Sequence, residues 1–255
     1  MPGHVSRRAE YTVVMISNAR LLMYSKNSLL CASLATTVVC SGCASTADSS
    51  DPLEPFNRAM YSFNEGLDEV AIKPVATGYR QVLPAPVQSG VRNFFSNLDD
   101  VTVLVNDVLQ LKLAQGVSDF MRLIFNTAFG VLGFADVASE MGLRKHNEDF
   151  GQTLGRWGIG SGAYVVLPFF GPSSLRDGLG FAMDTHYIDP VPALDDVPAR
   201  NWTVVTRAVS KRADLLDATR TVEAAALDDY EFTRDFYLER RESLVNDGKP
   251  HQADL

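Results

Sequence analysis

A glycine-rich segment divides this 255-residue chain into two stretches with a helical pattern. Eight of its 18 glycines fall between Gly130 and Gly162, where the backbone must turn tightly or approach another group closely. Apolar residues recur every three or four positions from Phe56 to Phe129, before this segment, and the pattern resumes after Gly171. The sequence therefore predicts a mainly α protein, with one helical domain interrupted by a Gly-rich loop segment.

The first predicted helix opens at Asp51–Pro55 and runs to Pro74, which ends it because proline has no backbone N–H. Its apolar residues from Phe56 to Leu67 share one face, since they are spaced by 4, 3 and 4 positions. Further helices are predicted over 75–82, 86–98, 101–113, 118–129, 202–216 and 221–245.

Between these helices the sequence predicts one strand, at Tyr164–Leu167, followed by a rigid apolar turn at Pro168–Pro172. Ser173 is predicted to cap a helix that carries Leu175 and Met183.

Composition excludes wholesale disorder and argues against nucleic acid as a partner. Hydrophobic residues make up 46% of the chain and charged residues 21%, which is enough apolar surface for a packed core. The net charge of −8 is unsuited to phosphate binding. No apolar run approaches the roughly 18 residues of a membrane-spanning helix, so we expect none.

Residues 23–42 have the parts of a secretory signal peptide. Lys26 supplies the basic start, the apolar stretch Leu29–Val39 follows, and small residues stand before Cys43. A cysteine at this place resembles the lipidation site of bacterial lipoproteins, where it is diacylated, cleaved and N-acylated. Since no aspartate stands beside Cys43, the site resembles those sorted to the outer membrane. The alternative is an ordinary signal for a soluble secreted protein.

These features predict five segments. They are a mis-assigned N-terminal extension (1–22), the signal peptide (23–42), a lipidated tether (43–50), the helical domain (51–247) and a flexible tail (248–255). Removal of residues 1–42 leaves 19 basic and 30 acidic residues, a net charge of −11. Acyl chains and apolar faces, rather than charge, would therefore hold the protein on a membrane.

Metal and redox patterns are weak. Cys40 and Cys43 have the C-x-x-C spacing of a metal or redox site, but they have no partner pair. Gly158–Ala163 fits the dinucleotide pattern G-x-G-x-x-A, but a strand follows where a helix is required. Neither His146 nor His186 lies at a zinc-ligand spacing. We therefore expect no cofactor and no metal.

Catalytic patterns are equally weak, and we expect no enzyme activity. Asp177 and Asp184 could join His186 and a serine in a hydrolytic triad, but the sequence cannot show that geometry. Ser161 lacks the glycine two positions upstream that a hydrolase nucleophile elbow requires.

Sequence blocks that span nearly the whole predicted mature chain point to a family. The blocks are Asp51–Glu54, Phe56–Asn64, Lys73–Ala76, Asn93–Leu98, Asn126–Thr127 with Gly130 and Gly133, Asp149–Gly160, Tyr164–Pro168, Gly171–Ser173 and Arg176–Asp177. In this order, and together with Cys43, they resemble the MlaA (VacJ) lipoproteins. The departures are the N-terminal extension, Cys40 where such signals have Leu or Val, and a generic C-terminal tail.

The resemblance implies a ring-like helical domain embedded at the inner leaflet of the Gram-negative outer membrane, enclosing an amphipathic channel beside a porin trimer. It implies that the protein removes mislocalised phospholipids from the outer leaflet and passes them to a soluble periplasmic carrier. An ATP-driven inner-membrane complex would complete the route. Two alternatives stay open: a structural porin-associated lipoprotein without transport, and a membrane-anchored phospholipase.

Three groups of residues are candidates for this function. Cys43 is the predicted lipid attachment site. The predicted membrane face or channel lining comprises Phe56, Met60, Phe63 and Leu67 among acyl chains, with Asn57, Arg58 and Asn64 on the polar side. The predicted gate or turn comprises Gly155, Gly158, Gly160 and Gly162.

Overall fold

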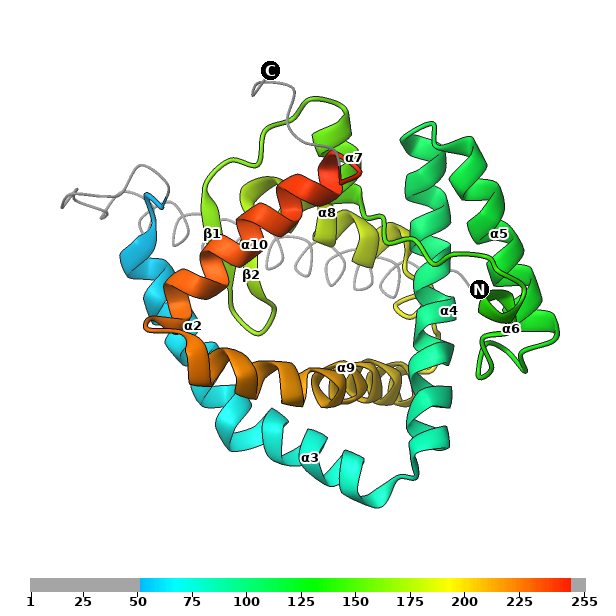
Figure 1. Cartoon of the computed structure of the whole chain (residues 1–255), viewed down its shortest axis with the longest axis horizontal. Helices are drawn as coiled ribbons and strands as arrows, with labels where there is room; N and C mark the ends of the chain where they lie inside the picture. The colour runs from blue at the N-terminus through cyan, green and yellow to red at the C-terminus, as the bar shows by residue number, and fades with distance from the viewer. Residues whose placement is uncertain (1–50, 249–255) are drawn as a thin grey trace, which may run out of the picture. The chain divides into compact units, whose positions relative to one another are not determined.

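The computed structural model describes residues 51–248, and helices dominate this part of the chain, as predicted (Figure 1). The signal peptide, Cys43 and the tether lie outside the described residues, as does the tail from residue 249. None of the helices that the structure describes is both long and apolar enough to cross a membrane.

The chain opens with α2 (Glu54–Leu67), which continues through a π-helical turn, η1 (Asp68–Ile72), into α3 (Lys73–Val82). The prediction that Pro74 ends the first helix is wrong, because α2 ends at Leu67. Pro74 instead lies where the π-helical turn meets α3, a place where the regular α-helical hydrogen bonds are already interrupted.

Two long helices, α4 (Ala85–Leu109) and α5 (Leu113–Ala128), form the next hairpin. The predicted break at Asp99–Asp100 is absent, because both carboxylates have side-chain partners. Asp100 is buried beside Lys145, and Asp99 pairs with Arg207, so neither starts a new helix. Helix α5 also begins five residues before the predicted start at Ser118.

The Gly-rich segment carries two short helices, α6 (Val137–Glu140) and α7 (Phe150–Arg156), and leads into a β-hairpin. Strand β1 (Tyr164–Leu167) confirms the predicted strand and pairs antiparallel with β2 (Gly171–Ser174). The turn between them uses left-handed conformations at Phe169 (φ 68°) and Gly171 (φ 84°).

The C-terminal part holds α8 (Leu175–Met183), a π-helical turn η2 (Asp184–Ile188), α9 (Val197–Ala225) and α10 (Asp229–Val245). Ser174, rather than the predicted Ser173, caps α8 by accepting a hydrogen bond from the Asp177 N–H at 3.1 Å. Helix α9 runs through the predicted gap at 217–220, and the chain breaks only at 226–228, where Asp228 caps α10.

Packing contacts link these elements into a closed circuit (Figure 1). Helix α3 packs on α9, α9 on α4, α4 on α7, α7 on α8, and the hairpin connects α8 back to α2. Helix α10 lies across α7 and β2. Within the described residues this circuit agrees with the predicted ring-like helical domain.

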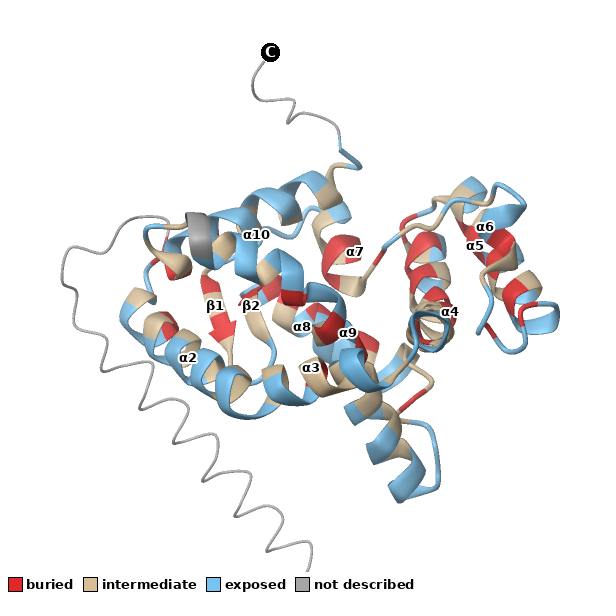
Figure 2. Ribbon diagram, turned by 60° about the horizontal axis from the view of Figure 1, so that its bottom comes forward, coloured by how far each residue is buried: buried red, intermediate tan, exposed pale blue. Residues whose placement is uncertain are grey.

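The interior is unusually polar. Among residues 51–248, twenty polar or charged residues are buried against ten apolar ones, and the buried positions are scattered rather than gathered in one core (Figure 2). Two small apolar clusters exist: Ala76 with Ala213 and Leu216, and Tyr164 with Val166 and Tyr230. Hydrogen bonds and ion pairs must therefore carry much of the specificity of this fold.

Candidate functional site

Two asparagines of α2 fasten the β-hairpin to that helix. The Asn57 amide donates to the Tyr164 carbonyl at 3.1 Å and accepts from the Val166 N–H at 2.9 Å. Two turns further along, the Asn64 amide donates to the Leu167 carbonyl at 3.0 Å and accepts from the Phe169 N–H at 2.8 Å. The structure differs from the predicted headgroup contact at Asn57, because its fully buried amide is occupied by groups of the protein itself.

Arg58, also predicted on the polar side of a channel, ties α2 to the start of α10. Its guanidinium contacts Glu54 at 2.7 Å, Asp228 at 2.9 Å and Glu231 at 3.1 Å, and lies 4.4 Å from the ring centre of Tyr230. These partners give Arg58 a structural role.

The predicted apolar face of α2 is divided by the fold. Phe56 and Phe63 remain 40% and 46% exposed, and the Phe63 ring meets Phe169 of the hairpin turn edge-on at 5.5 Å. Met60 instead packs against the Tyr164 cluster, and Leu67 is half-buried. Phe56 and Phe63 therefore keep the surface position that contact with lipid requires, whereas Met60 does not.

The four glycines predicted as a gate or turn have different surroundings. A Cβ at Gly155 would lie 2.9 Å from the Val245 side chain. Gly158 and Gly162 have left-handed backbones, with φ of 90° and 69°. Gly160 has neither constraint, because a Cβ there would meet nothing within 4 Å.

Helix α5 turns its polar face inward and its apolar face outward. Asp119, Arg122 and Asn126, spaced by three and four residues, are buried against α4 and α6, whereas Phe120 and Ile124 are 47% and 44% exposed. The apolar row continues beyond these two with Leu113, Val117 and Met121. This orientation is the reverse of that of a helix on a water-soluble core.

Six inward polar side chains of α4 and α5 form what we call the polar seam: Asp100, Asn106, Asp107, Asp119, Arg122 and Asn126. Most of them have partners within the chain. Arg122 pairs with Asp136 at 3.1 Å, and Asp119 lies 2.7 Å from Nδ1 of His146.

Asp107 is the exception in the polar seam, because neither of its buried oxygens accepts a hydrogen bond from an N–H or hydroxyl group of residues 51–248. Burial, followed by a hydrogen bond to the Asp119 carboxylate, raises the pKa of Asp107 to about 8. Asp107 therefore keeps its proton at neutral pH. No sequence motif identifies this pair, although the polar row at 119, 122 and 126 has helical spacing.

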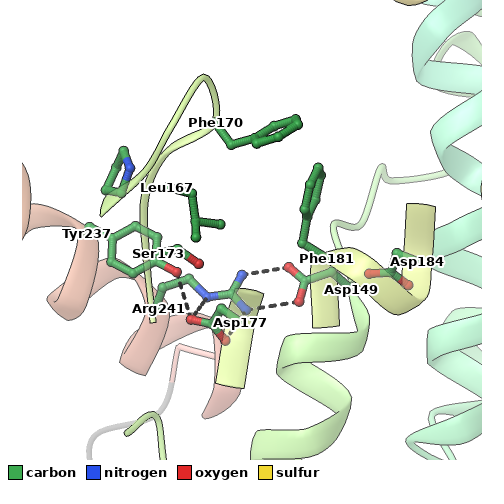
Figure 3. A pocket seen from close by; sticks show the side chains of 10 residues that line it. Asp149, Leu167, Phe170, Ser173, Asp177, Phe181, Asp184, Tyr237 and Arg241 are labelled. Atoms are coloured by element: carbon green, nitrogen blue, oxygen red, sulfur yellow. Dashed lines mark hydrogen bonds and ion pairs between the residues drawn. The ribbon is translucent and has the colours of Figure 1, made fainter. Parts of the chain in front are cut away.

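A second polar cluster lies where α7, α8, α10 and the β-hairpin meet (Figure 3). Arg241 Nη1 donates to Asp149 at 2.6 Å and its Nε to Asp177 at 3.0 Å. Burial works to raise the pKa values of both aspartates, but the hydrogen bonds from Arg241 hold them below their usual values. This cluster lines a cavity of about 230 Å³.

The predicted alternative of a hydrolytic triad is not assembled. The His186 ring contacts the Tyr187 ring edge-on, with 4.5 Å between the ring centres, while Asp177 binds Arg241 and Tyr237. No serine hydroxyl within residues 51–248 is hydrogen-bonded to a histidine, and this part of the chain holds no group of three side chains suited to a metal ion.

The fold and these sites define a mainly helical protein with a polar interior and a broad apolar exterior. Residues 49–244 match the sequence model of the family described as MlaA lipoprotein, and the chain belongs to that family.

Named relatives agree with this assignment. The intermembrane phospholipid transport system lipoprotein MlaA of Escherichia coli (strain K12) is 38% identical over 226 residues, which cover 85% of this chain and 88% of the relative. The protein of the same name from Haemophilus influenzae is 32% identical over 236 residues, covering 88% and 93%.

A solved structure is also similar to this chain. It comes from work on the structural basis for maintenance of bacterial outer membrane lipid asymmetry, and it matches with a TM-score of 0.67 and 36% identity. The match covers 77% of this chain and 100% of the solved one.

Proposed function

We propose that this protein is an outer-membrane lipoprotein that removes mislocalised phospholipids from the outer leaflet and passes them to a soluble periplasmic carrier. In this proposal residues 23–42 are a signal peptide, Cys43 carries the acyl chains, and the helical domain sits in the inner leaflet beside a porin trimer. Family membership and the named relatives support the phospholipid cargo.

The observation that carries the proposal is the inverted orientation of α5. Exposing Phe120 and Ile124 to water while burying Asp119 and Arg122 would be unfavourable for a protein surrounded by water. Among acyl chains the same arrangement is favourable, since each buried CH₂ contributes about 0.8 kcal/mol. A domain anchored by lipid and facing the bilayer with α5 has the position that phospholipid removal requires.

The competing classes have less support. A phospholipase needs a nucleophile beside a base, and the described part of the chain shows no such pair. A purely structural partner of porins needs no polar interior, whereas phospholipid movement needs polar surroundings for the headgroup next to apolar surroundings for the tails.

Fluorescence from single labelled cysteines tests the membrane orientation. In the proposed mature chain Cys43 is the only cysteine, and its thiol is used for the lipid, so Ile124→Cys gives one labelling site. An environment-sensitive dye at this position should report an apolar surrounding in phospholipid vesicles. Arg220→Cys, on exposed α9, is the control and should report water.

A dye at position 124 that reports water, in a protein that floats with the vesicles, would refute the embedding. The transport step is tested by labelling surface phospholipids in a deletion strain. The wild-type gene should restore low outer-leaflet phospholipid, and normal labelling in the deletion strain would refute the function.

A further inference from the structure

The cavity beside Arg241 has charged groups at its floor and apolar groups at its mouth. Asp149, Asp177, Asp184 and Arg241 contribute the charges, and the rim includes Phe170 (Figure 3). At about 230 Å³ it is smaller than the roughly 300–1,000 Å³ of pockets for drug-sized ligands. It therefore suits a small group rather than a whole lipid.

Two of the three aspartates are already neutralised. Arg241 contacts Asp149 at 2.6 Å and Asp177 at 2.9 Å, and Asp177 also pairs with Arg176 at 2.9 Å. The Tyr237 hydroxyl donates a further hydrogen bond to Asp177 at 2.8 Å. A phosphate would find few free donors here, because the guanidinium groups are engaged by carboxylates.

Asp184 lines the same cavity without a cationic partner among the described side chains. It is only 8% exposed, and it accepts hydrogen bonds from Asn106 Nδ2 at 3.0 Å and from the Phe150 N–H at 2.8 Å. Burial raises the pKa of Asp184 to about 6 despite the opposing charge of Arg241, because the carboxylate form is poorly stabilised at this place. A buried charge without a counter-ion is costly, and a cationic ligand would relieve that cost.

The mouth of the cavity is suited to an alkylammonium ion. The rings of Phe170 and Phe181 lie 4.8 Å apart, and their faces attract cations.

We propose that this cavity binds the ammonium group of a zwitterionic phospholipid headgroup, with Asp184 as its counter-charge and Phe170 and Phe181 beside it. The inference rests on the proposed transport of phospholipid, and it adds a preference for amine-bearing over anionic lipids.

Competition binding with the full-length protein in non-ionic detergent tests this preference. The probes are phosphatidylethanolamine and phosphatidylglycerol with identical acyl chains, each displacing one fluorescent phospholipid. Wild-type protein should prefer phosphatidylethanolamine by on the order of tenfold. Asp184→Asn should reduce the preference to less than about twofold, since it removes the counter-charge.

Two further variants test whether the preference depends on the charge of Asp184 and on the aromatic ring beside it. Asp195→Asn removes the same charge from an exposed carboxylate outside the cavity, so the preference should remain. Phe181→Leu leaves the hydrogen bonds of Asp184 intact and should lower the preference by about two- to threefold.

The outcomes separate this inference from the proposed function. Equal affinity of the wild type for both lipids, or an unchanged preference in folded Asp184→Asn, would overturn the headgroup site while leaving transport intact. Equal losses in Asp184→Asn and Asp195→Asn would assign the preference to overall charge and also overturn the site. Failure of the wild type to bind either lipid, together with normal lipid asymmetry in the deletion strain, would overturn the proposed function itself.

Discussion

Replacing Asp107 by asparagine should remove a specific pH dependence from the stability of this protein. Asp107 is completely buried in the polar seam, and burial together with the Asp119 carboxylate raises its pKa to about 8. The unfolded chain releases the Asp107 proton near pH 4, whereas the folded chain keeps it up to about pH 8. Since the folded state binds the extra proton in this range, the free energy of unfolding must fall as pH rises from 4 to 8.

The size of this change in the free energy of unfolding is that expected when unfolding releases one proton. Each pH unit within this range should lower the free energy of unfolding by about 1.4 kcal/mol, so a rise from pH 5.5 to 7.5 should cost about 2.7 kcal/mol. The charges around Asp107 set the upper end of the range: Asp119 from α5 and Glu148 before α7 raise its pKa, and Lys112 lowers it. An asparagine side chain has the same shape as the aspartate that it replaces, is neutral at every pH, and can donate a hydrogen bond to Asp119 as protonated Asp107 does.

Denaturant unfolding of the full chain in detergent at several pH values measures this difference. The Asp107→Asn variant should be about as stable as the wild type at or below pH 4 and exceed it progressively towards pH 8. Asp195→Asn removes an exposed carboxylate and serves as the matched control. Parallel stability curves for wild type and Asp107→Asn between pH 5 and 8 would refute the raised pKa of Asp107.

Four further substitutions have separate expectations. Gly180→Ala should destabilise the fold by about 3 kcal/mol in thermal or denaturant unfolding, because its Cβ would lie 2.3 Å from the backbone nitrogen of Gly151. Gly160→Ala should change the free energy of unfolding by less than about 0.5 kcal/mol, because a Cβ at this position would meet nothing within 4 Å. A loss of lipid asymmetry in this variant would therefore support the predicted gate, and normal asymmetry would contradict it. Cys43→Ala should leave an uncleaved or mislocalised precursor without function, and normal processing and activity of this variant would contradict lipidation. Phe63→Asp should raise outer-leaflet phospholipid at normal protein level, since Phe63 is 46% exposed, whereas a lower level with normal asymmetry per molecule would place Phe63 in the core.

Short sequence patterns correctly predicted the elements whose ends are set by residues nearby in the sequence. The strand at Tyr164–Leu167 and its turn followed from β-branched residues and the following prolines. The predicted helix break at Asp99–Asp100 was wrong, because partners distant in the sequence neutralise both carboxylates and allow α4 to continue. The cavity beside Arg241 could not be predicted either, because its charged residues come from separate elements with no fixed spacing.

The orientation of α5 shows a more general limit of sequence patterns. A helical period of apolar residues predicts that two faces differ, but the period is the same whether the apolar face meets a protein core or lipid. Phe120 and Ile124 therefore predicted the helix correctly and left its buried face undetermined. Only the partners of the opposite face decide it: Asp119 and Arg122 are bound to His146 and Asp136, and a helix whose polar side is satisfied inside the protein must present its apolar side to the surroundings. The polar seam thus fixes which face of α5 meets the surroundings, and the proposed function requires that these surroundings be lipid.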